Sequence, residues 1–162
     1  MAISYLLLAG CGAMGSSPVP SPSVTVSHGG QSRPTTWPGE FLVRYGGTEL
    51  ALAPFTYCYT GDAGGVCVDG FDDDPPSVGA PDEVAVFVPV PGFDELTVTQ
   101  SSAEGECSVE ADTVPLDGGW WTVRPRGPAG EYVVSIFASG DGGDMVAEVV
   151  WRTPSGRGGS CS

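Results

Sequence analysis

Short stretches in which apolar and polar residues alternate are the feature that most restricts how this 162-residue chain can fold. Alternation with a period of two is typical of β-strands with one buried face, and no stretch has the three-and-four spacing of a long amphipathic helix. Glycine and proline turn signals separate the stretches. The expected strands are residues 24–28, 41–45, 50–59, 84–90, 95–100, 107–112, 120–124, 131–138 and 145–152. The pattern predicts an all-β fold, an antiparallel β-sandwich of about seven to nine short strands.

The entry to the penultimate stretch makes this prediction more specific. The segment Pro128-Ala-Gly-Glu-Tyr-Val-Val134 has a glycine two residues before Tyr132, and it resembles the tyrosine corner of immunoglobulin-like domains. The resemblance implies that the Tyr132 hydroxyl bonds back to the main chain at the start of its strand. It also implies that Trp151, on the next strand, covers the core. Antibody domains carry a cysteine at the position of Val134, so the resemblance extends to the topology only.

The first residues carry a second resemblance. Leu8-Ala9-Gly10-Cys11 follows a short apolar run and resembles the lipobox of bacterial lipoproteins. In that family the cysteine thiol receives a diacylglycerol and the chain is cut just before the cysteine. The resemblance therefore implies cleavage between Gly10 and Cys11 and lipid attachment at Cys11. The apolar run is far shorter than the roughly twenty residues that a transmembrane helix needs.

These features divide the chain into three parts. We expect a lipoprotein signal peptide over residues 1–10, a lipidated cysteine and a tether rich in Ser, Pro and Gly over residues 11–40, and the β-sandwich domain over residues 41–162. Signals of this family begin with Lys or Arg, which residues 1–5 lack, so we expect the true start to lie upstream. The predicted location is the extracytoplasmic face of the cell membrane, held there through the lipid.

The remaining cysteines then number four, which suits two disulfides in an oxidising compartment. Four cysteines allow three connectivities. Cys58 and Cys67 enclose a glycine-rich turn that can bring their ends together, so we pair them, which leaves Cys107 with Cys161. A zinc site is the competing use, but no two cysteines have the short spacing of a metal knuckle.

Charge narrows the range of partners. Twenty acidic residues face six basic ones, giving a formal net charge of −14, and every basic residue is an arginine. Nucleic acid and anionic lipid head groups are therefore poor partners, and we expect no binding to nucleic acid, because binding to either depends on basic side chains. The lack of lysine beside abundant Gly, Ala, Val and Pro resembles the small lipoproteins of GC-rich actinomycetes, whose roles are generally unassigned.

Few residues suggest catalysis. The single histidine, His28, lies near the tether, and there is no lysine for Schiff-base chemistry. We therefore expect a protein that is not an enzyme. Paired carboxylates leave open one alternative, an envelope-polymer hydrolase.

One acidic run is a candidate calcium-binding site, and calcium is the one cofactor that the sequence suggests. Its carboxylates belong to Asp69, Asp72, Asp73 and Asp74. Oxygen ligands suit calcium, but the spacing is not that of an EF-hand, and a solvated charged loop is the simpler interpretation. A calcium-binding adhesion module is thus a second alternative.

Aromatic residues suggest binding. Trp120 and Trp121 are consecutive, so on one strand only one of them faces the core. The other is either covered by a loop or available to a sugar or a cationic peptide. The sequence thus predicts a membrane-tethered protein with a binding or structural role in the cell envelope and an envelope protein or glycan as its partner. A protease inhibitor acting through the loop at residues 58–67 is a weaker alternative.

Overall fold

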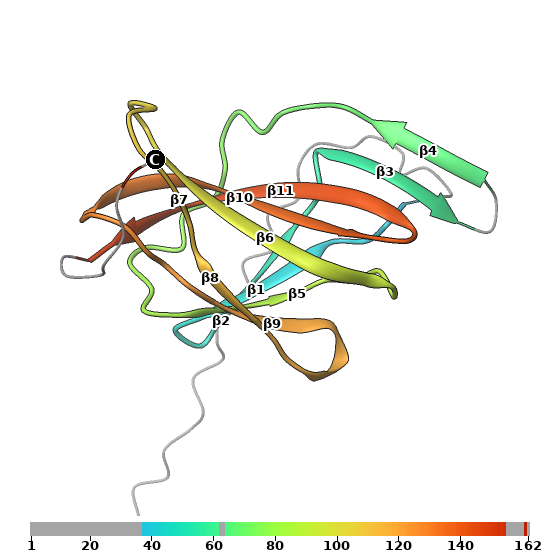
Figure 1. Cartoon of the computed structure of the whole chain (residues 1–162), viewed down its shortest axis with the longest axis horizontal. Helices are drawn as coiled ribbons and strands as arrows, with labels where there is room; N and C mark the ends of the chain where they lie inside the picture. Colours follow the sequence, from blue (N-terminus) through green and yellow to red (C-terminus); the bar gives the residue numbers. More distant parts are fainter. Residues whose placement is uncertain (1–36, 62–63, 155–160, 162) are drawn as a thin grey trace, which may run out of the picture.

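A computed structural model describes residues 37–61, 64–154 and 161, which form two antiparallel β-sheets packed face to face (Figure 1). The five-stranded sheet has the order β2-β1-β5-β9-β8, with bounds Thr48–Leu52, Phe41–Tyr45, Val84–Phe87, Trp120–Arg124 and Asp112–Pro115. The six-stranded sheet has the order β4-β3-β11-β10-β6-β7, with bounds Gly64–Val68, Thr56–Gly61, Gly143–Thr153, Gly130–Gly140, Phe93–Ser102 and Ser108–Glu110. The predicted all-β sandwich is confirmed.

The strand order is that of an immunoglobulin-like Greek key. In immunoglobulin constant domains one sheet has the order A-B-E-D and the other contains C-F-G. Here β1-β5-β9-β8 takes the first arrangement and β6-β10-β11 the second, with β7 beside β6. The main chain of residues 76–79 lies along β11 and exchanges hydrogen bonds with Val150 and Arg152.

The described residues contain eleven strands, more than the seven to nine expected. The additional strands β2, β3 and β4 are inserted between the A-type strand β1 and the B-type strand β5. The prediction of one strand over residues 50–59 is wrong, because the chain leaves β2 at Leu52 and enters β3, in the other sheet, at Thr56. Pro54 lies in the break, and proline has no N–H to continue a ladder.

A second predicted strand, over residues 107–112, is also divided. β7 belongs to the six-stranded sheet and β8 to the five-stranded sheet, and buried Ala111 lies at the crossing. The glycine-rich turn expected between Cys58 and Cys67 is mostly strand, because β3 and β4 form a hairpin in which these two residues pair. β5 ends at Phe87, three residues earlier than expected.

The core lies between the two sheets and is built by alternate residues of each strand. From the six-stranded sheet the main contributors are Leu96, Val98, Tyr132, Val134, Ile136, Ala138, Met145, Ala147, Val149 and Trp151. From the five-stranded sheet they are Phe41, Val43, Leu50, Leu52, Val84, Val86 and Val123. Apolar burial of this extent is the main stabilising contribution to the fold.

The predicted tether and the described domain meet near Trp37. Trp37 lies within the range predicted as tether, yet its ring packs edge-on against Tyr57, with 5.4 Å between ring centroids. The strand expected at residues 24–28 lies outside the described residues. Within those residues, no helix has the length and apolar character needed to cross a membrane.

Candidate functional site

A groove of about 470 Å³ opens at one end of the sandwich, between the β5–β6 loop and the β8–β9 loop. In immunoglobulin variable domains the loop between strands B and C, here β5–β6, lies at the binding end. Most of the lining residues are apolar, proline or glycine, and Asp94 is the one charged residue among them. The lining consists of Phe87, Val88, Pro89, Val90, Pro91, Gly92, Phe93, Asp94, Pro115, Leu116, Gly118, Gly119 and Trp121.

The two loops that form the groove are joined by a main-chain hydrogen bond. Val88 N–H donates to the carbonyl oxygen of Gly119 at 2.9 Å. Gly119 ends the short 3-10 turn η1 (Asp117–Gly119) and has a φ of +81°. A Cβ at this position would lie 3.1 Å from the Val88 carbonyl oxygen, so glycine is required both by the backbone conformation and by the close approach of the loops.

The consecutive tryptophans of β9 point to opposite faces of their sheet, as predicted. Trp121 is half-buried, packs against the core and lines the groove. Trp120 lies on the outer face, where its ring is 5.2 Å from the ring of Phe87. The guanidinium of Arg44 lies over the Trp120 ring, 4.1 Å from its centroid. The outward tryptophan is thus covered in part by a cation–π contact with the same sheet.

An apolar row on the outer face continues from the groove. The strand register places Leu42 opposite Phe87 and Phe87 opposite Trp120. Leu116 extends the row beside Trp120. Its N–H donates to the Trp120 carbonyl oxygen at 2.8 Å, and Leu116 is 51% exposed. Phe87 and Leu116 also line the groove, so the groove and the row form one apolar surface.

The acidic run does not gather its carboxylates around one point. Asp72 accepts a hydrogen bond from Asp74 N–H at 3.2 Å, and Asp69 accepts one from the Thr56 hydroxyl at 3.5 Å. Across residues 37–61, 64–154 and 161, no three or more His, Cys, Asp or Glu side chains are placed to share a metal ion. Calcium binding by Asp69, Asp72, Asp73 and Asp74 stays a prediction.

One carboxylate near this run has a perturbed pKa. Glu148, on β11, lines a smaller cavity of about 190 Å³ together with Phe71 and Asp72. Burial raises the pKa of Glu148, and the negative charge of Asp72 raises it further. Glu148 therefore holds a proton more readily than an isolated glutamate does.

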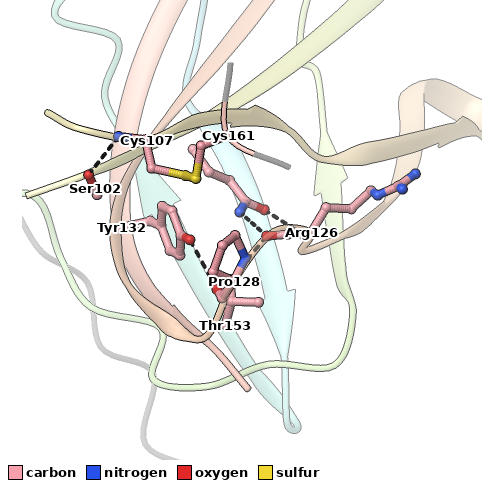
Figure 2. The surroundings of a disulfide bond; sticks show 8 residues. Ser102, Cys107, Arg126, Pro128, Tyr132, Thr153 and Cys161 are labelled. Carbon is pink, nitrogen blue, oxygen red and sulfur yellow. Dashed lines mark hydrogen bonds between the residues drawn. A yellow bond between two sulfur atoms is a disulfide. The ribbon is translucent and has the colours of Figure 1, made fainter. Parts of the chain in front are cut away.

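The tyrosine corner is present as the resemblance implies. The Tyr132 hydroxyl donates to the carbonyl oxygen of Pro128 at 3.0 Å (Figure 2). Trp151 lies opposite Tyr132 in the β10–β11 register, and both side chains are buried.

Both predicted cysteine pairs are disulfides in the structure. Cys58 and Cys67 join β3 to β4, with 4.1 Å between their Cα atoms. Cys107 and Cys161 join the residue before β7 to the end of the chain, with 4.8 Å between their Cα atoms (Figure 2). The proposed cleavage and lipidation residues, Gly10 and Cys11, lie outside the described residues.

Two features of the structure are not predicted by the sequence analysis. The groove was not predicted, because Val88 and Val90 were assigned to a strand, although Pro89 and Pro91 signal that the strand ends. The buried amide of Gln100 was also missed. Its Nε2 donates to the Arg126 carbonyl oxygen at 2.6 Å, and its Oε1 accepts from Arg126 N–H at 2.9 Å.

Comparisons with known proteins add no assignment: no protein-family model matches the chain, and the searches of curated proteins and of solved structures found no match.

Proposed function

We propose that this chain is a lipid-anchored binding protein on the extracytoplasmic face of the cell membrane and that its groove binds a partner protein of the cell envelope. The observation that carries the proposal is the groove itself, an apolar hollow open at the loop end of the sandwich. Binding sites are typically concave, largely apolar and built on a preformed scaffold. Two disulfides further support an oxidising, extracytoplasmic compartment.

The lining favours a peptide segment over a glycan. Each sugar hydroxyl that is removed from water needs a hydrogen-bonding partner, and Asp94 is the one charged side chain among the lining residues. Proline rings and aromatic rings instead suit an extended, proline-rich or apolar segment, in the manner of grooves that recognise polyproline II helices. The net charge of −14 favours a neutral or basic segment.

Binding is tested by titrating the full chain with a neutral proline-rich peptide and, separately, with soluble cell-wall glycan fragments. The fluorescence of Trp121, which lines the groove, is expected to change with the peptide. Leu116→Glu places a charge at the exposed rim and is expected to weaken peptide binding by about tenfold or more. The matched control is Val114→Glu, a 44% exposed position of β8 outside the groove lining, which should bind like wild type.

Saturable binding of the glycan alone would overturn the proposed ligand class. Equal losses in the two glutamate variants would exclude the groove as the site.

The anchor is tested by the intact mass of the protein recovered from the membrane of a bacterial host. A mature chain that begins at Cys11 and carries a diacylglycerol is expected, and Cys11→Ala should release the protein from the membrane. A mature protein that retains Met1, or that has no lipid at Cys11, contradicts this part of the proposal.

A further inference from the structure

Three of the four edge strands carry residues that discourage pairing with another chain. The edge strands are β2 and β8 in one sheet and β4 and β7 in the other. β2 has Glu49, β7 has Glu110, and β8 has Asp112 and Pro115. Charged side chains and proline are the usual means by which sheet edges avoid adding a strand. β4, with the sequence Gly-Gly-Val-Cys-Val, has neither.

β4 is also an exposed and well-supported edge. It pairs with β3 along its full length, from Gly61 opposite Gly64 to Tyr57 opposite Val68. The Cys58–Cys67 disulfide crosslinks the two strands. In Figure 1 β4 lies at the periphery of the six-stranded sheet, and Val68 is 38% exposed. A further strand could therefore add to this edge without rearrangement of the sheet.

We propose that β4 pairs with β4 of a second copy of this chain, antiparallel and about a two-fold axis, which joins the two six-stranded sheets. Two copies that each carry a net charge of −14 repel one another over most of their surfaces. β4 brings five uncharged residues to the contact, so no carboxylate of this strand opposes one of the second copy. When a strand pairs antiparallel with its own copy, both strands make the same main-chain hydrogen bonds. A two-fold interface requires this equivalence.

Gly65 provides a substitution that changes the edge without disturbing the monomer. A Cβ built at Gly65 would meet the Thr60 hydroxyl oxygen at 3.5 Å and the Tyr59 carbonyl oxygen at 3.9 Å, both ordinary contacts. Its backbone lies outside the left-handed region, so a side chain causes no strain there. Gly65→Glu therefore adds a charge to each β4 of the proposed dimer while leaving the fold intact.

The test is sedimentation equilibrium of the full chain carrying Cys11→Ser, which removes the proposed site of lipid attachment. We expect a monomer–dimer equilibrium, with the dimer dissociation constant raised about tenfold or more by Gly65→Glu. Val114→Glu, the same change in charge on edge strand β8, should leave it unchanged. Hydrogen exchange should also show protection of residues 64–68 that increases with protein concentration.

A wild-type chain that stays monomeric at millimolar concentration would overturn the proposal. So would a dimer that survives Gly65→Glu, or one that Val114→Glu weakens equally. If Gly65→Glu fails to fold, the concentration dependence of exchange in the wild-type chain decides: no added protection at residues 64–68 rejects the β4 interface.

Discussion

Glu148 lies half-buried on β11, beside the negative charge of Asp72. Its pKa in the folded chain lies above the ordinary value of 4.5, first because of burial and then because of Asp72. The folded chain therefore holds this proton more tightly than the unfolded chain does. Protonated Glu148 therefore contributes to the free energy of unfolding. This contribution is fully present below pH 4.5 and is lost as the pH rises through the folded-state pKa.

Replacing Glu148 by glutamine should accordingly stabilise the protein at neutral pH, because the variant never carries the buried charge. Urea unfolding at pH 7 and at pH 4 measures the effect, and the gain should fade at the lower pH, where wild-type Glu148 is protonated. Asp72→Asn should lower the pKa of Glu148 in an NMR titration. A gain of equal size at both pH values would contradict this assignment.

Individual residues were predictable from sequence where their signal is local. Tyr132 and the glycine two residues before it lie within one short segment, and the hydroxyl bonds to Pro128, four residues away. Gln100 gave no such signal, because it bonds to the main chain of Arg126, 26 residues away. That pairing depends on how β6 meets the segment after β9, which alternation does not encode.

At the scale of elements, alternation located strands but not the sheet to which each belongs. Residues 107–112 alternate without interruption and residues 50–59 are mostly apolar, yet each range divides between two sheets. Between β7 and β8 the buried positions keep one phase, from Cys107 to Ala111, so the crossing leaves no mark on the pattern. Between β2 and β3 the buried positions change phase, from Pro54 to Tyr57, but a mostly apolar run hides that change. The groove was not predicted for a related reason. Val88 and Val90 are buried although they lie outside β5, so the apolar pattern looks the same in the loop as in the strand.

The two disulfides should differ in the stability that they contribute. Cys107–Cys161 closes a loop with a sequence separation of 54 residues, against nine for Cys58–Cys67. In the loop-entropy model the longer loop is worth about 4 kcal/mol and the shorter about 2.5 kcal/mol. Chemical denaturation of the two double Cys→Ser variants should therefore show the larger loss of unfolding free energy for Cys107 and Cys161.

If the two losses of unfolding free energy were equal, or if the loss were larger for Cys58 and Cys67, the crosslinks would act on the folded state and not on the unfolded chain. For Cys58–Cys67 this would appear as faster hydrogen exchange confined to β3 and β4, with global stability unchanged.

At the scale of the molecule, the excess of acidic residues should govern the response to salt. The four described ion pairs are Arg44–Glu49, Arg124–Glu83, Arg126–Asp112 and Arg152–Glu131. All four are exposed, and exposed pairs contribute little to stability. Most of the twenty acidic side chains have no basic counterpart, because the chain has only six arginines.

Screening of this repulsion should therefore outweigh the weakening of the ion pairs. The melting temperature is expected to rise as sodium chloride increases from about 0.01 M to about 0.5 M, over which the Debye length falls below the spacing of surface charges. Calorimetry at pH 7 measures the shift. A falling melting temperature would show that the four ion pairs matter more than the net charge.

The disulfide between Cys107 and Cys161 also determines how the protein responds to proteases. An endoprotease that cuts once anywhere between Cys107 and Cys161 leaves two pieces that remain covalently joined. Since β7 to β11 all lie inside this loop, a single cut cannot release any of these strands, and shedding of a fragment requires a second cut or a reductant.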